Sequence, residues 1–285
     1  MSSSVNPAGL EAPDTTAPAP APAAPSGRRA RIMAVTSGKG GVGKTFLSAN
    51  LAAALARLGR RVLVLDADLG LANLDVVLNL HPKVTLHDVF TGKVALEDAI
   101  LPAPGGFSVL LAGSGLVEYS RLTLEVREQL LTIIDTVAPR FDHILLDTGA
   151  GISEVVLYAV SLADDVLVIT TPEPTSMTDA YATIKVLATQ QQRRDIRLVV
   201  NQVGRVGEGR AIRGQLQLVI DRFVTPTLAD DETGTKQGPK LELLGEVPLD
   251  PAVREAVQKR RLLLQLLPGC AAARAVEAIA TRLAP

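Results

Sequence analysis

One octapeptide, Gly38 to Thr45, has the residue order of a phosphate-binding loop. It reads GKGGVGKT and fits the pattern G-x-x-x-x-G-K-[ST], whose glycines are expected to adopt positive φ angles and to bring backbone N–H groups onto phosphate oxygens. Lys44 would neutralise charge on the β- and γ-phosphates, and the Thr45 hydroxyl is of a type that binds Mg²⁺. The predicted nucleotide contacts are Gly38, Lys39, Gly40, Gly41, Val42, Gly43, Lys44, Thr45 and Phe46.

The segments on either side of the octapeptide support this interpretation. Residues 31–36 are short and apolar, as in a buried strand, and residues 45–58 carry apolar side chains at helical spacing. A strand, a glycine-rich loop and a helix in this order point the N-terminus of the helix at an anion. The alternative, a glycine-rich turn without a ligand, is disfavoured by this context.

Three aspartates follow strand-like segments and could serve the metal or the attacking water. Asp147 ends the apolar segment 143–147, which is the Walker B position that holds Mg²⁺ through water; capping of the following turn is the alternative. Asp66 and Asp68 stand two residues apart at the end of a second apolar segment. Their spacing fits a metal and water site and fits solvated loop charges equally well. The predicted Mg²⁺ ligands are Thr45, Asp66 and Asp147, with both aspartates acting through water.

Apolar segments and helical periodicities alternate along the rest of the chain. This alternation predicts an α/β fold of the P-loop NTPase type, with a mostly parallel, twisted sheet of about seven strands and helices on both faces. Ligands of such a sheet gather at the carboxyl ends of the strands. The expected strands are 31–36, 61–66, 107–111, 143–147, 165–170, 196–201 and 241–247, and the clearest further helices are 123–137, 153–162, 175–190 and 211–223.

Composition divides the chain into an arm and a larger domain. Residues 1–30 include an Ala- and Pro-rich run that cannot form a packed core, so we expect a disordered arm. Residues 31–285 are expected to form one ATPase domain, because 47% of the 285 residues are hydrophobic. The arm lacks the apolar segment of a secretory signal, and no run reaches the about 18 apolar residues of a membrane span. We therefore expect a cytoplasmic protein.

The number of cysteines and the net charge argue against several kinds of site and partner. Cys270 is the single cysteine, which leaves no disulfide framework and no Cys-x-x-Cys pair for a metal cluster. The net charge of −1 makes nucleic acid an unexpected partner. Arg193, Arg194 and Arg197 form a local cluster that could contact phosphates, although a solvated helix end is the more common role of such a cluster.

Three blocks together resemble a known family. KGGVGKT with its early lysine, DADLGLANLD (66–75) and LLDTGAGIS (145–153) are similar to the deviant-Walker-A ATPases, the MinD/ParA family. TLHDVFTGK (85–93), LAGSGLVEYSRL (111–122) and TTPEPTSMTDAYATIK (170–185) resemble the flagellar-number regulators of that family, called FlhG, FleN or YlxH. The resemblance runs from about Arg31 to the C-terminus, and the TPEPTSMTDAY run is its most selective part.

The resemblance implies an ATP hydrolase with ATP and Mg²⁺ as cofactors and with an ATP-dependent homodimer as its switched state. In that family a lysine at the position of Lys39 reaches across the dimer to phosphates bound by the other subunit. Asp68 matches the aspartate needed for hydrolysis, and Asn73 matches a switch-region asparagine. The residues implied in catalysis are Lys39, Lys44, Asp68 and Asp147.

Two further positions are implied in adenine binding. Asn201 and the turn Pro248-Leu249-Asp250 match positions that surround the base in the family. The alternative for Asn201 is an ordinary residue at the end of a strand, and the alternative for Pro248 is a residue that ends a loop.

The implied function is slow, partner-regulated ATP hydrolysis that sets flagellar number or placement. The implied partners are the flagellar GTPase FlhF, a flagellar transcription regulator or a switch component. Placement of the division site or partition of DNA, as by MinD or ParA proteins, is the alternative function. A nucleotide-binding scaffold without turnover is a further one, and a metal-cluster carrier is disfavoured by the missing Cys-x-x-Cys pair.

Two departures from the family bear on its partners. Residues 1–30 contain no Asp-Gln pair of the kind that engages FlhF. Residues 271–283 are Ala-rich and lack lysine and aromatic residues, so peripheral contact with the inner face of the cytoplasmic membrane or the cell pole should be weak. Residues 259–264, KRRLLL, are a better interfacial candidate, but a core segment with a basic edge is the favoured interpretation.

Overall fold

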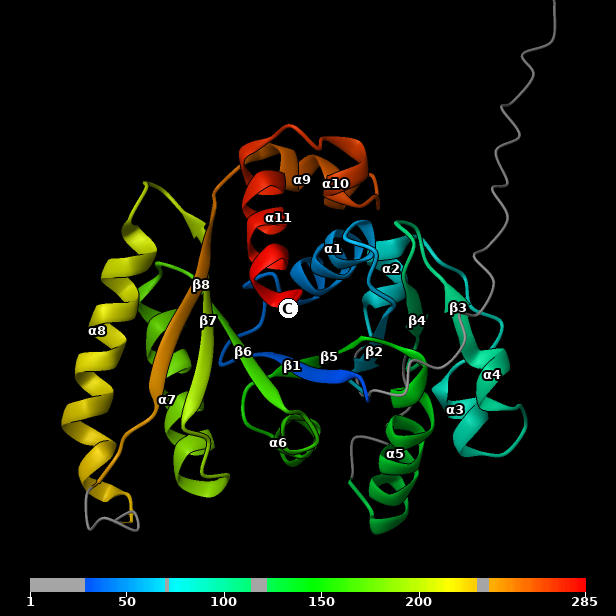
Figure 1. Ribbon diagram of the computed structural model, residues 1–285, viewed down its shortest axis with the longest axis horizontal. Coiled ribbons are helices and arrows are strands. Elements are labelled where there is room, and N and C mark those ends of the chain that lie inside the picture. The colour runs from blue at the N-terminus through cyan, green and yellow to red at the C-terminus, as the bar shows by residue number, and fades with distance from the viewer. Residues whose placement is uncertain (1–28, 70–71, 114–121, 230–235) are drawn as a thin grey trace, which may run out of the picture.

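The centre of the protein is an eight-stranded sheet, seen in a computed structural model that describes residues 29–69, 72–113, 122–229 and 236–285 (Figure 1). The strand order is β3-β4-β2-β5-β1-β6-β7-β8, and every neighbouring pair is parallel except β3 with β4. The strands are β1 (Arg31–Ser37), β2 (Val62–Ala67), β3 (Ile100–Pro102), β4 (Ser108–Leu110), β5 (His143–Ala150), β6 (Asp165–Thr170), β7 (Asp195–Val203) and β8 (Lys240–Pro248).

Helices cover both faces of the sheet. In Figure 1, α1, α9, α10 and α11 lie above the sheet, α5 and α6 lie below it, and α7 and α8 lie at the left beside β7 and β8. The residues on the two faces form two separate apolar cores. The helices are α1 (Lys44–Arg57), α2 (Leu74–Leu78), α3 (Leu86–Phe90), α4 (Leu96–Ala99), α5 (Leu124–Val137), α6 (Glu154–Ser161), α7 (Pro174–Gln190), α8 (Glu208–Phe223), α9 (Pro251–Gln258), α10 (Leu263–Leu266) and α11 (Ala271–Leu283), with 3₁₀ turns at η2 (Ala138–Arg140) and η3 (Thr225–Thr227).

The predicted α/β class, the parallel sheet and the helices on both faces are confirmed. All seven expected strands are present within three residues of their predicted ends, the largest difference being β5, which continues to Ala150. The eighth strand, β3, adds an antiparallel edge of three residues and ends in Pro102. A segment this short carries no measurable alternation, and its proline weakens a strand pattern, so β3 was not predicted.

The C-terminal segments pack inside the protein. Leu262, Leu263 and Leu264 are buried, which confirms the core interpretation of the leucine run. The apolar side of α11, including Val276 and Ile279, is buried as well, and the helix packs against α1 and β8. Among the described residues, no helix has the length and apolar character needed to cross a bilayer. The arm expected over residues 1–30 falls outside the described residues except for its last two.

The arginine cluster is half-buried and has structural partners, so it is not the solvated helix end that was the more common interpretation. Arg193 donates to the carbonyls of Val160 (2.8 Å) and Ala163, at the C-terminal end of α6. Arg194 donates to the carbonyl of Gln237 (2.7 Å), and Arg197 pairs with Asp165 on the adjacent strand (3.4 Å). These contacts hold helix and strand ends together, because each guanidinium satisfies a neighbouring backbone carbonyl or carboxylate.

Candidate nucleotide-binding site

The glycines of the loop between β1 and α1 serve different purposes. Gly41 (φ 78°) and Gly43 (φ 96°) adopt the left-handed conformation that was predicted for all four. Gly38 does not, but a Cβ there would lie 2.1 Å from the carbonyl oxygen of Asp179 on α7. The φ angle of Gly40 is not positive, and a Cβ placed on Gly40 would have no other residue's atom within 4 Å. The expectation of positive φ is therefore wrong for Gly38 and Gly40, and Gly38 is required by the close approach of α7.

Lys44 lies inside the loop rather than on its surface. Its side chain is 8% exposed, and its Nζ donates a hydrogen bond to Ser37 Oγ (2.9 Å), which in turn donates to the Lys39 carbonyl (2.7 Å). Burial lowers the pKa of Lys44, and the negative charges of Asp147 and Asp68 oppose that shift. Ser37 was not singled out from the sequence, although it fixes where the ammonium group points.

Asp147 lies in the C-terminal half of β5, which continues to Ala150, and stands beside the first turn of α1. Its carboxylate accepts hydrogen bonds from Ser48 Oγ (2.9 Å) and from the Thr45 hydroxyl. Burial raises its pKa to about 6, although those hydrogen bonds and the positive charge of Lys44 lower it. Ser48 was missed by the sequence analysis, since a serine inside a helix carries no motif, but its position three residues after Thr45 puts it on the same side of α1.

Asp66 stands next to Asp147, because the two residues are paired in register between β2 and β5. Asp66 is 1% exposed; Oδ1 accepts the backbone N–H of Asp68 (3.1 Å), and Oδ2 has no hydrogen-bond partner among the described residues. Burial raises its pKa well above the ordinary range, and the negative charge of Asp147 adds to the effect. A buried carboxylate oxygen without a donor is a feature that a cation or its water would satisfy.

Asp68 and Asn73 lie beyond the end of β2. Asp68 approaches the C-terminal end of β5, where a Cβ on Gly149 would be 3.3 Å from Asp68 Oδ1. Asn73 is exposed at the N-terminus of α2. The sheet edge thus brings Lys44 together with Asp66, Asp68 and Asp147, and its oxygen donors fit a hard cation such as Mg²⁺.

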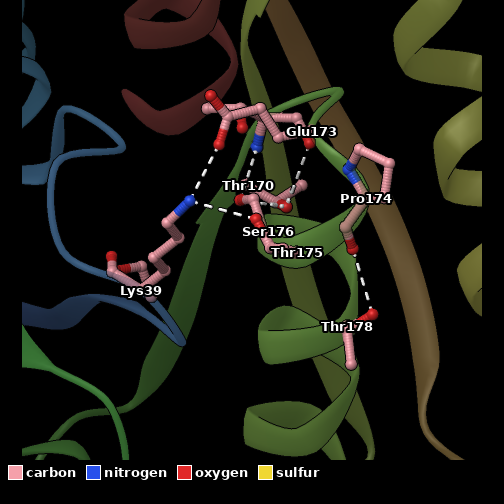
Figure 2. Close-up of polar contacts among 9 residues, drawn as sticks. Lys39, Thr170, Glu173, Pro174, Thr175, Ser176 and Thr178 are labelled. Carbon is pink, nitrogen blue, oxygen red and sulfur yellow. Dashed lines mark hydrogen bonds and ion pairs between the residues drawn. The ribbon is translucent and has the colours of Figure 1, made fainter.

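Lys39 points away from this cluster and toward the start of α7. Figure 2 shows its Nζ donating to Glu173 Oε2 (2.9 Å) and to Thr175 Oγ1 (3.0 Å). The side chains of Lys39 and Glu173 are 39% and 63% exposed. An ion pair this exposed contributes less than about 1 kcal/mol, so it orients Lys39 without locking it.

The run Thr170 to Ser176 forms the turn that presents Glu173 and Thr175. Ser176 Oγ lies 3.0 Å from Thr170 Oγ1 and accepts the backbone N–H of Thr171 (3.0 Å), as Figure 2 shows in part. Pro174 is the first residue of α7, where its missing N–H leaves no bond unmade. The TPEPTSMTDAY run, the most selective part of the family resemblance, therefore has a structural role: it fixes the hydrogen-bond acceptors that face Lys39.

A cavity of about 420 Å³ opens beside Gly41 and Gly43 and is bordered by Phe46, Asn201 and Pro248. Asn201 Nδ2 donates to the carbonyl of Val42 (2.8 Å), and its Oδ1 accepts the N–H of Gln202 (2.9 Å). The amide keeps one N–H and one lone pair for a ligand. The structure therefore places both residues expected near adenine in one cavity next to the loop.

Comparison with known proteins agrees with this geometry. A family model described as an AAA domain matches residues 30–200. The antiactivator FleN of Pseudomonas aeruginosa is 41% identical over 252 residues, which are 88% of this chain and 85% of that protein. The flagellum site-determining protein YlxH of Helicobacter pylori is 31% identical over 254 residues, 88% of this chain and 80% of that one.

A solved structure provides the ligand chemistry of the fold. The septum site-determining protein MinD of Pyrococcus horikoshii, complexed with Mg-ADP, superposes with a TM-score of 0.71 at 27% identity, over 89% of this chain and 96% of that one. The expected ATP and Mg²⁺ agree with that complex, and the α/β prediction agrees with its fold. The chain belongs to the MinD/ParA family of P-loop ATPases, in the branch that contains FleN and YlxH.

Proposed function

We propose that this ATPase is a nucleotide-controlled dimerisation switch that regulates flagellar number or placement. The observation that carries the proposal is the different placement of the two lysines of one loop. Lys44 is buried among the aspartates of the sheet edge, whereas Lys39 is held at the surface by the turn before α7. Lys44 would therefore contact the nucleotide of its own subunit, and Lys39, whose ion pair with Glu173 is weak, would be available to contact the nucleotide of a second subunit.

Within one subunit, the described side chains supply three elements of hydrolysis. Lys44 and the loop N–H groups would bind the β- and γ-phosphates, and Thr45 with Asp147 and Asp66 would hold Mg²⁺, the aspartates through water. The cation would neutralise phosphate charge as the bond to the γ-phosphate breaks. Asp68, at the open side of this cluster, is placed to orient the attacking water. Hydrolysis is expected to be slow until a partner acts on this arrangement.

Across a dimer, Lys39 would leave Glu173 and Thr175 and bind the phosphates in the other subunit. The exchange is feasible because the pair that it breaks contributes less than about 1 kcal/mol. A contact to phosphates in a site closed to water is stronger, since the effective dielectric constant is lower there. ATP would therefore favour the dimer, and the loss of the γ-phosphate would return Lys39 to Glu173.

Turnover at different protein concentrations tests this mechanism. If the dimer is the active form, the ATPase rate per subunit rises with protein concentration and reaches a plateau. Lys44→Ala is expected to abolish turnover at every concentration, and Lys39→Ala is expected to remove the concentration dependence. A rate per subunit that is the same at all concentrations would contradict a dimeric active form.

The flagellar role is proposed from the relative YlxH, whose name is flagellum site-determining protein, and from the resemblance of the sequence to flagellar-number regulators, which the relative antiactivator FleN shares in name. The second candidate is the placement of the division site, which MinD proteins of similar fold carry in their name. Deletion of the gene separates the two candidates. Changed flagellar number with normal cell length supports the flagellar role, whereas minicells with unchanged flagella would favour the division role. FlhF or another flagellar protein is the proposed partner, to be tested by its effect on ATP turnover.

A further inference from the structure

Helix α9 forms a wall of the cavity beside the phosphate loop, and no motif had pointed to it. Val253, Arg254, Val257 and Gln258 line the cavity from this helix. The helix is fixed at its start, because Asp250 Oδ1 accepts the N–H of Ala252 (3.0 Å) and Oδ2 accepts the N–H of Ala272 on α11 (3.2 Å). The wall is therefore a rigid part of the site.

The apolar side chains of this wall face open space. Val257 is 48% exposed and the adjoining Leu249 is 70% exposed, although both line the cavity. Gly41 and Gly43 border the same cavity, so it continues from the place where the phosphates are expected. Apolar side chains at this position are suited to pack against the flat faces of a nucleotide base.

Arg254 is the unusual member of the wall. Within the described part of the chain its guanidinium has no ion pair and no hydrogen bond, whereas Lys259 on the next turn is paired with Glu255 (2.7 Å). In the proposed site, the buried Lys44 would serve the phosphates, and the amide of Asn201, which lines the cavity, would serve the edge of the base. An unpaired guanidinium beside apolar side chains is suited to the remaining surface of a nucleotide, which is the face of the base.

We propose that Arg254 stacks its guanidinium on the face of the purine and is a base-binding residue of this ATPase. The inference rests on the proposed nucleotide site and extends it. A guanidinium is planar, weakly hydrated and stacks on aromatic surfaces, which an ammonium group cannot reproduce. Because every purine has such a face, this contact increases affinity for ATP and GTP alike.

Titration calorimetry on the full chain tests the proposal with ATP, GTP and tripolyphosphate, each with Mg²⁺. Arg254→Ala is expected to weaken ATP and GTP by the same factor, up to roughly tenfold, and to leave tripolyphosphate unchanged. Arg254→Lys is expected to lose as much as the alanine variant, because it keeps the charge but not the plane. Arg274→Ala, an exposed arginine of α11, is the matched control and should bind like the original chain.

Three results would overturn the stacking contact. They are an unchanged ATP affinity in Arg254→Ala, full rescue by Arg254→Lys, and a weakened affinity for tripolyphosphate, which would assign Arg254 to the phosphates. Failure of the proposed nucleotide site looks different. In that case Lys44→Ala would bind ATP like the original chain, and both proposals would fall together.

Discussion

Replacing Asp147 by asparagine is predicted to stabilise the nucleotide-free protein while abolishing its ATPase activity. Burial raises the pKa of Asp147 from 3.8 to about 6, so the folded protein holds this proton more tightly than the unfolded chain does. Between about pH 4 and pH 6 the folded state then binds more protons than the unfolded state, and stability falls as the pH rises through this window. This rise in the pKa of Asp147 corresponds to about 3 kcal/mol.

Asparagine removes this cost and keeps the local geometry. Its oxygen can still accept the hydrogen bond from Ser48, and its amide can donate to the Thr45 hydroxyl. The free energy of unfolding of Asp147→Asn should therefore exceed that of the original chain by up to about 3 kcal/mol at pH 8, and the gain should vanish near pH 4.

Urea denaturation followed by circular dichroism, in EDTA and without nucleotide, measures this difference. Asp195→Asn, at the exposed start of β7, is the control for a change of net charge. Addition of Mg-ATP should reverse the order, because ligand at about 100 times its Kd stabilises the original chain by about 2.7 kcal/mol and the variant binds it poorly. A variant that is less stable than the original chain at pH 8 in EDTA would refute the burial argument.

Four other substitutions follow from the geometry. Ser48→Ala should lower the free energy of unfolding by about 2 kcal/mol, since a hydrogen bond to a buried carboxylate is lost; unchanged urea curves would count against that bond. Gly38→Ala should destabilise by about 3 kcal/mol through the contact with α7, whereas Gly40→Ala should cost less than about 1 kcal/mol; equal thermal shifts would contradict this distinction. Glu173→Gln should lower the ATP concentration for half-dimerisation by up to about fivefold in light scattering, and an unchanged midpoint would show that the pair does not compete.

The sequence was most informative where a pattern and its physical cause coincide. Apolar segments of five to seven residues predicted seven strands, because parallel strands are buried on both faces. The loop lysine and the strand-end aspartates were found from their spacing, and the register of β2 with β5 placed Asp66 beside Asp147 as expected.

The contacts that depend on tertiary packing could not be predicted from the sequence. Ser37 and Ser48 became visible only when the loop folded against β5, since a lone serine has no periodic signal. The requirement for Gly38 comes from α7, which is more than 130 residues later in the chain. The partners of Lys39 in the monomer and the α9 wall are likewise products of packing between segments distant in sequence.

The mass of the protein in solution with ATP tests the central claim most directly. Asp68→Ala, which is expected to retain ATP, should be a dimer with Mg-ATP and a monomer with Mg-ADP in analytical ultracentrifugation. Adding Lys39→Ala to it should leave a monomer with either nucleotide, while ATP binding persists through Lys44. A double variant that dimerises with ATP as readily as Asp68→Ala would contradict the role of Lys39 as the residue that joins two subunits through the nucleotide.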